Sequence, residues 1–187
     1  MTNPLGAWPA VRIPHGSTIS IAHLESIGQY LGSIGLTWSS SASAVWPVAN
    51  TAYFIPFRLS EPVTVTLLWW LNGTAVAGNV DCGLYDAAGT RIVSTGSTVQ
   101  SGTSAIQSVN VTDTLIGPGN FFMALALDDA TTATIRRFAP GNASFLKACG
   151  CAEQATAFAL PATATFATYG PNFLPIFGMT LAPITVV

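Results

Sequence analysis

The sequence has very little charge. It carries 6 basic and 8 acidic residues, and the charged share of its 187 residues is 7%, against about 25% in an average soluble domain. So few Lys and Arg argue against a nucleic-acid-binding surface, and the scarcity of Glu and Lys excludes a coiled coil. Because 50% of the residues are hydrophobic, the chain also falls outside the disordered class.

A weakly charged surface is poorly protected against association. We therefore expect much of the surface to be covered by other copies or other proteins, which points to a component of an assembly. The alternative is a monomer solvated by Ser, Thr, Asn and Gln. The length suits one domain with extra arms.

The sequence shows neither the long apolar run of a membrane-spanning helix nor the pattern of a Sec signal at its first residues. Residues 26–57 and 154–187 carry no charge, but serines and two prolines interrupt the first stretch and four prolines interrupt the second. Neither provides about 20 consecutive apolar residues, which a membrane-spanning helix needs. The first residues, MTNP, do not form a basic segment followed by an apolar one. We expect no membrane span and no Sec signal, and therefore synthesis in a cytoplasm.

The three cysteines do not make an even disulfide framework. Cys82 alternates with Val80 and Leu84 and is predicted to lie in the core. Cys149 and Cys151 are separated only by a glycine, too close to pair without strain. They are interpreted as reduced thiols; the alternative, half of a metal site, lacks a second CxxC or HxxxH element. No cofactor is expected.

The first 50 residues differ in character from the rest. Pro4, Pro9 and Pro14 predict an extended arm over residues 1–16. Residues 17–36 predict a short amphipathic helix, and its apolar stripe consists of Leu24, Ile27, Leu31 and Ile34. Residues 39–44 are read as a polar linker, and we place a boundary near residue 50. The predicted organisation is a docking arm and helix at 1–50, a β-sandwich at 51–140, and a Pro/Gly-rich excursion with the sandwich's closing strand at 141–187.

From residue 53 onward the hydrophobic period changes to two, which is typical of strands. The turn at 86–89 places Gly89 at a left-handed position, and Pro56 marks an edge strand or a bulge. The residues predicted to face inward are Tyr53, Ile55, Phe57, Leu59, Val63, Val65, Leu67, Trp69, Leu71, Val80, Cys82, Leu84, Phe121, Met123, Leu125, Leu127, Phe177, Met179 and Leu181. Further strands are predicted at 91–94, 105–111 and 134–138.

Seven or eight short strands with frequent turns predict an all-β fold, a β-sandwich of the jelly-roll type. The second faces of two strands are apolar, and they carry Leu68 and Trp70 on one strand and Phe122 on another. Such faces need a cover. The N-terminal helix, the C-terminal segment or another subunit could supply it. We therefore predict an interface that includes Trp8, Leu24, Ile27, Leu31, Ile34, Leu68, Trp70 and Phe122.

The sequence offers little for catalysis. His15 and His23 lie in the predicted arm and helix, without an acid placed to assist them. Asp81, Asp86, Asp113, Asp128 and Asp129 lie at or near loops and are interpreted as turn-capping residues; a calcium site is the alternative. Trp8, Trp38 and Trp70 are candidates for stacking on sugar rings, whereas Trp46 and Trp69 are interpreted as packing residues.

Three segments form a distinctive pattern of strands and turns over residues 46–130. They are 46–59, which contains WPVAN and YFIPFRL, 79–91 with the sequence NVDCGLYDAAGTR, and 115–128, where Pro-Gly precedes an aromatic-rich strand. This pattern resembles that of virion proteins of tailed bacteriophages. The resemblance implies a particle-surface protein such as a head decoration, tail or fibre subunit, and it implies no catalytic residue.

These observations lead to one functional hypothesis and one alternative. The chain is expected to be a non-enzymatic structural protein of a bacteriophage virion, made in the bacterial host cytoplasm. Its expected partners are further copies of itself and other virion proteins, without nucleic acid or membrane. The alternative is a carbohydrate-binding adhesin module that recognises a host-surface glycan. Apolar surface spread over several faces favours the first, and surface aromatics in one concave patch favour the second.

Overall fold

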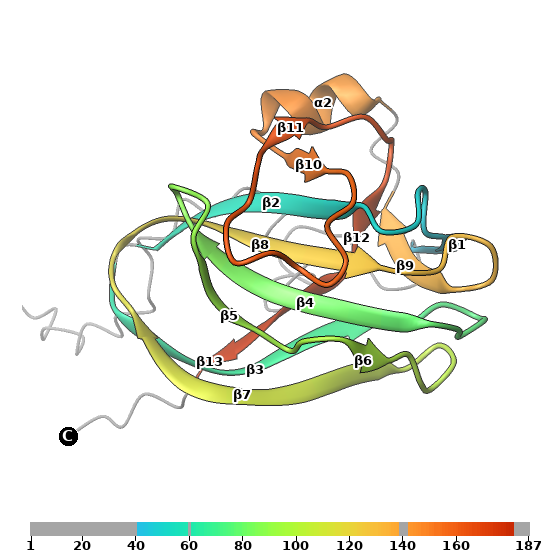
Figure 1. Ribbon diagram of the computed structural model, residues 1–187, viewed down its shortest axis with the longest axis horizontal. Helices are drawn as coiled ribbons and strands as arrows, with labels where there is room; N and C mark the ends of the chain where they lie inside the picture. The colour runs from blue at the N-terminus through green and yellow to red at the C-terminus, as the bar shows by residue number, and fades with distance from the viewer. Residues whose placement is uncertain (1–40, 60, 139–141, 182–187) are drawn as a thin grey trace, which may run out of the picture.

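The chain folds into antiparallel β-sheets. The computed structural model describes residues 41–59, 61–138 and 142–181. Within these ranges, three antiparallel sheets are accompanied by a single helix of six residues (Figure 1). The predicted arm at 1–16 and helix at 17–36 lie outside the described residues. The all-β, sandwich-like fold is confirmed, and the jelly-roll order of connections stays a prediction.

The largest sheet forms one layer of the sandwich. Its strands, in spatial order, are β11 (Ala167–Thr168), β10 (Ala152–Gln154), β2 (Ala52–Leu59), β8 (Gly119–Leu127), β4 (Asn79–Asp86) and β5 (Arg91–Ser94), and β6 (Thr98–Val99) also pairs with β4. The central strands β2, β8 and β4 are long and pair over most of their length. The segment between β10 and β11 lies against the outer face of these strands.

Two three-stranded sheets complete the fold. One contains β13 (Phe177–Leu181), β3 (Val63–Leu71) and β7 (Ile106–Ile116), and the other contains β1 (Ala42–Val45), β9 (Thr134–Phe138) and β12 (Leu174–Pro175). Figure 1 shows β3 and β7 facing β8 and β4 across the interior. The main hydrophobic core lies between these layers and takes residues from both.

The inward faces predicted for β2, β4 and β8 are confirmed by the membership of the main core, whereas the alternate residues Phe54, Tyr85 and Ala124 are also buried but belong to a separate cluster. Tyr53, Ile55 and Phe57 on β2 are at most 3% exposed, and Val80, Cys82 and Leu84 on β4 are completely buried, as are Met123, Leu125 and Leu127 on β8. The strand predicted at 134–138 coincides with β9. At the turn after β4, Gly89 has φ +88° and its N–H donates to the Asp86 carbonyl oxygen over 3.1 Å.

The inward face predicted for β3 is only partly confirmed in its second half. Val65 faces the core as predicted, and Trp69 and Leu71, which are 7% and 8% exposed, also belong to the main core. The completely buried positions, however, are Leu68 and Trp70. The pairing of β3 with β13 and with β7 shifts register between Val65 and Leu67, and such an irregularity moves the most deeply buried positions to the other parity.

The folded body begins before the predicted boundary near residue 50. β1 pairs with β9 from Ala42 to Val45, within the region interpreted as a linker and arm. Trp46 is completely buried, and its indole N–H donates to the carbonyl oxygen of Thr51 over 3.0 Å. Its ring packs on Tyr53 and Phe173, with centroids 4.7 and 5.4 Å away. Trp46 therefore joins β1 to the core of the sandwich.

A short helix was not anticipated in the excursion after residue 141. Helix α2 (Ala143–Ala148) begins at Asn142, whose side-chain oxygen accepts the N–H of Ser144 over 2.8 Å. Leu146 is the buried residue of the helix and contributes to the main core. The described part of the chain has no helix with the length and hydropathy required to cross a membrane.

A buried polar cluster closes one end of the sandwich. Asn72 is completely buried, and its side chain contacts Trp70, Gln100 and Gln107. Gln100 in turn donates to the carbonyl oxygen of Thr134 and accepts the N–H of Ala77, both over 2.9 Å. The cluster ties together loops that are far apart in the sequence. These hydrogen bonds replace the ones that the buried side-chain amides lose with water when the chain folds.

Candidate functional site

The candidate site lies on the outer face of the large sheet, where the loop between β10 and β11 is bound. Strands β10 and β11 pair with each other at the edge beside β2. The loop that joins them, residues 155–166, folds back over β8 and β4 (Figure 1). We call this loop the clasp. Its residues Ala157, Leu160 and Ala164 are at most 9% exposed and pack against the sheet, whereas most of the residues between them are exposed.

The clasp rests on a floor of small and aromatic residues. Ala52, Phe54, Tyr85, Ala124 and Ala126 are buried beneath it and form, with clasp residues, a hydrophobic cluster separate from the main core. Gly83 lies directly under Leu160: a Cβ atom at this glycine would be 2.7 Å from Cδ1 of Leu160 and 3.2 Å from Cβ of Ser94. Only glycine permits the leucine side chain to approach the strand so closely.

Three side chains of the floor bind the clasp backbone at Leu160 and Pro161. The carboxylate of Asp81 accepts the N–H of Leu160 over 3.0 Å, and the guanidinium of Arg91 donates to the carbonyl oxygen of the same residue. The hydroxyl of Tyr85 donates to the carbonyl oxygen of Pro161 over 2.7 Å. Burial raises the pKa of Asp81, whereas the bond from Leu160, the hydroxyl of Thr95 and the charge of Arg91 lower it.

The far end of the clasp pairs with the start of β5 as a short strand would. The N–H of Arg91 donates to the carbonyl oxygen of Ala162 over 2.9 Å, and the N–H of Ala164 donates to that of Gly89 over 2.7 Å. A β-bridge links Thr90 to Thr163. The clasp is thus held mainly through its main chain, as an added strand would be.

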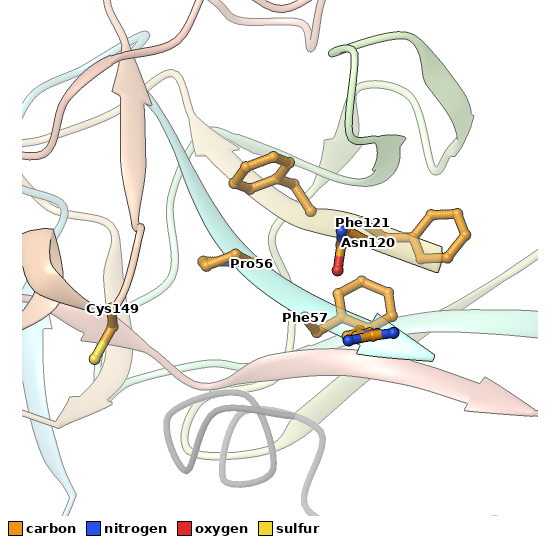
Figure 2. Close-up of a pocket in the computed structure, with 7 residues that line it drawn as sticks. Pro56, Phe57, Asn120, Phe121 and Cys149 are labelled. Carbon is orange, nitrogen blue, oxygen red and sulfur yellow. The ribbon is translucent and has the colours of Figure 1, made fainter. Parts of the chain in front are cut away.

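A pocket of about 370 Å³ opens beside the clasp, between β2, β8 and the end of α2. Its lining residues are Pro56, Phe57, Arg58, Asn120, Phe121, Phe122 and Cys149. Figure 2 shows Cys149 at one end and Asn120 with Phe121 at the other, with Pro56 between them. Arg58 pairs with Asn120 across the two strands, and both are exposed. The pocket therefore offers a guanidinium and an amide beside aromatic rings.

Asp86 and Asp129 cap their own turns, as predicted, whereas Asp128 binds a residue of β4 and Asp81 binds the clasp. Asp86 accepts the N–H groups of Ala88 and Thr90 over 2.9 and 2.8 Å. Asp128 accepts the backbone and side-chain N–H groups of Asn79, each over 2.7 Å. Across the described ranges, no three His, Cys, Asp or Glu side chains gather where they could hold a metal ion.

Asp129 allows a direct test of this turn chemistry. Its carboxylate accepts the N–H groups of Thr132, Ala133 and Thr131, which lower its pKa to about 2. Because the pKa is depressed, the contribution of Asp129 to stability is present above the unfolded value of about 4 and is lost as the pH falls toward about 2. We expect a carboxyl ¹³C NMR titration of Asp129 to show its midpoint near the lower value; a midpoint near the unfolded value contradicts the hydrogen-bonded turn.

The cysteines occupy different environments. Cys82 is completely buried in the core, as predicted, and burial raises its pKa well above the usual value. Burial and the neighbouring Cys149 raise the pKa of Cys151 to about 12. Cys149 is half-buried and lines the pocket. All three are free thiols in the structure.

The predicted interface residues on the sheets need correction. Leu68 and Trp70 do not form an apolar outer face: they point into the core, where Met179 and Phe177 of β13 pair beside them. The face of Phe122 is covered by the clasp, and its ring lies 4.5 Å from that of Phe166. The C-terminal segment therefore supplies the cover that the sequence called for. Trp8, Leu24, Ile27, Leu31 and Ile34 lie outside the described residues.

The candidates for sugar stacking are also reduced. Trp46, Trp69 and Trp70 are at most 7% exposed, and Tyr53, Tyr85 and Tyr169 are at most 1% exposed. Trp70 is therefore not available for a ligand, contrary to expectation, whereas the packing roles predicted for Trp46 and Trp69 are confirmed. Trp8 and Trp38 lie outside the described residues.

The sequence did not predict that residues of β4 and β5 bind a distant segment of the chain. Asp81 and Arg91 were visible as rare charged residues near strands, but their partner, the backbone of Leu160, is 79 residues from Asp81. The one available signal was the glycine at position 83 within an otherwise regular strand, since a strand glycine often marks a close approach of another backbone. No family model, curated protein or solved structure matches the chain.

Proposed function

We propose that the chain is a non-enzymatic structural subunit of a tailed-bacteriophage particle, displayed on the virion surface. It is held there by contacts with further copies of itself and with other virion proteins. The proposal combines the virion-like pattern of strands and turns in the sequence with the surface of the folded domain.

The observation that carries the proposal is the spread of exposed apolar side chains over separate parts of a weakly charged molecule. Val48 follows β1, Val99 and Ile106 lie on β6 and at the start of β7, Leu115 is at the other end of β7, and Phe145 is on α2. Their exposed fractions run from 53% for Phe145 to 70% for Leu115. Apolar surface at several places suits a subunit with several neighbours better than a module with one binding site.

The proposal predicts self-association that depends on the residues before β1. We expect the full chain to sediment as an oligomer at micromolar concentration, and the chain lacking residues 1–40 to remain folded but to sediment as a smaller species. The deletion ends before β1, so Trp46 and the pairing of β1 with β9 are kept. Antibodies against the chain are expected to label intact particles. A monomeric full chain that leaves particles unlabelled contradicts the proposal.

A glycan-binding adhesin is the second candidate, and the pocket beside the clasp favours it. Pockets that bind small ligands are about 300–1,000 Å³ in volume and combine apolar walls with a few polar groups. Here Arg58 and Asn120 lie beside Phe122 and Pro56, a combination that suits a sugar bearing a carboxylate. A monomeric chain that binds an immobilised anionic glycan, and loses binding on Arg58→Ala, would support this function instead.

A further inference from the structure

The groove beneath the clasp recognises an extended backbone. Five main-chain groups of residues 160–164 are bonded to the floor: the N–H and carbonyl of Leu160, the carbonyls of Pro161 and Ala162, and the N–H of Ala164. Main-chain bonding of this kind is how sheets bind added peptide strands. A separate segment of the same sequence has the groups needed to make the same contacts.

Side-chain contacts give the groove its selectivity. Leu160 needs the space above Gly83, and Ala157 and Ala164 fit over a floor that includes Ala124 and Ala126. The clasp itself, ATAFALPATATF, contains neither a charged residue nor a glycine. The occupant that suits the groove is thus an uncharged segment with alanines and a leucine followed by proline, which is the clasp sequence.

The way the clasp is attached allows it to leave its own groove. Its two ends lie side by side, because Ala152 pairs with Thr168 and Glu153 pairs with Ala167 in the β10–β11 hairpin. The hairpin remains paired with β2 whichever way the loop points. The apolar contacts of the clasp belong to the cluster on the outer face, separate from the main core. Opening the clasp therefore leaves the contacts of the sandwich core in place.

When the clasp is open, the clasp of a second copy can cover the groove that it leaves. Opening uncovers Phe54, Tyr85 and the alanine floor, together with Asp81, whose carboxylate loses the N–H of Leu160. An uncovered apolar face of this kind promotes association. The identical segment of another copy restores every bond. Exchange of identical elements between copies is a low-cost route to oligomers.

We propose that the clasp is exchangeable, so that in the assembled state the clasp of one copy occupies the groove of a second copy. The proposal rests on the proposed function as a self-associating subunit, and it names the contact that joins two copies. In an isolated copy the clasp closes on its own groove, as in the structure. Asp81, Gly83 and Arg91 form the receiving site.

Two complementary variants test the exchange. Gly83→Val blocks the groove, since its side chain would meet Leu160 and Ser94, but its clasp is intact. Leu160→Asp spoils the clasp by placing a carboxylate beside that of Asp81, but its groove is intact. When the two are co-expressed, the clasp of the first fits the groove of the second. Tagged Gly83→Val is expected to retain about tenfold more untagged Leu160→Asp than untagged Gly83→Val, a ratio that corresponds to about 1.4 kcal/mol.

A matched control replaces Leu160→Asp with Thr112→Asp, which adds a carboxylate at an exposed position of β7. The clasp of this control is intact and competes for its own groove, so less Thr112→Asp than Leu160→Asp should be retained. Equal retention of all untagged chains, Gly83→Val included, overturns the exchange.

Measurements on the unmodified chain cover the case in which a variant does not fold. An excess of the peptide of residues 155–166 is expected to lower the sedimentation coefficient of the oligomer, whereas the same peptide with Leu160→Asp leaves it unchanged. An oligomer that neither peptide affects overturns the exchange while the proposed structural function stands. A full chain that is monomeric at every concentration, and absent from particles, overturns the proposed function itself.

Discussion

Replacing Trp70 with alanine is expected to lower the free energy of unfolding by about 3–5 kcal/mol, the usual cost of deleting a buried aromatic side chain. Trp70 is completely buried in the main core, on the face that the register shift at Thr66 turns inward. Its indole N–H donates to the side-chain oxygen of Asn72 over 2.9 Å. The substitution leaves a cavity in the core and removes one bond from the polar cluster. Denaturant unfolding, followed by circular dichroism, measures the loss.

Two controls separate these effects. Trp70→Phe keeps an aromatic ring but loses the N–H donor. Its cost should be about 0.5–1.5 kcal/mol, that of one hydrogen bond, because the side-chain oxygen of Asn72 still accepts the N–H of Gln100. Leu115→Ala, at a side chain that is 70% exposed, should change stability by no more than about 0.5 kcal/mol. A loss below about 1 kcal/mol for Trp70→Ala would mean that Trp70 lies outside the core and that the register change at Thr66 is wrong.

The second large effect is expected for Asn72→Ala. Its side-chain oxygen accepts the N–H groups of Trp70 and Gln100, both over 2.9 Å, and its amide nitrogen donates to Ser101 and Gln107. Alanine leaves the indole N–H of Trp70 and one amide N–H of Gln100 without their acceptor, and each unsatisfied buried group costs about 1–3 kcal/mol. Gln107 still accepts the N–H of Ser101, and the carbonyl of the exposed Ser101 regains water. We therefore expect a total loss of about 3 kcal/mol.

Asn110 on β7 provides the comparison. It is an exposed asparagine of the same size in the sheet that contains Trp70, so Asn110→Ala should leave the unfolding midpoint nearly unchanged. The double variant with Trp70→Phe and Asn72→Ala should lose less than the sum of the two single losses, since both remove the same bond. Additive losses would show that Trp70 and Asn72 act independently, against the hydrogen bond between them.

Much of the large sheet could be predicted because its signals are local. On β4, Val80, Cys82 and Leu84 alternate with Asp81 and Gly83, and on β8, Met123, Leu125 and Leu127 alternate with the smaller Ala124 and Ala126, so these inward sets were identified correctly. The turn at 86–89 could be recognised from Asp86, whose carboxylate accepts the N–H groups of Ala88 and Thr90, and from Gly89, which has a positive φ. Where the larger apolar residues keep to one parity of a strand and a turn contains its own hydrogen bonds, neighbouring residues contain enough information.

The error on β3 arose where the local signal is ambiguous. Residues 67–71, Leu-Leu-Trp-Trp-Leu, are apolar at both parities, so periodicity does not indicate which side faces the core. The register shift at Thr66 decides the matter through pairing with β7 and β13, which come about 40 and 110 residues later. The same limit applies to β1, most of which was interpreted as a linker, because its pairing partner β9 comes about 90 residues later.

The sequence by itself determined that this protein is an all-β fold with a weakly charged surface, and which residues of β2, β4 and β8 face the core. Composition and short-range periodicity are sufficient for that, because burial of apolar surface depends on residue type and alternation. Only the tertiary structure decided the inward parity of β3, the closure of the sandwich by Asn72 and Gln100, and the place of the clasp over Gly83. Each of these depends on hydrogen bonds between segments distant in the chain, whose partners no local pattern specifies.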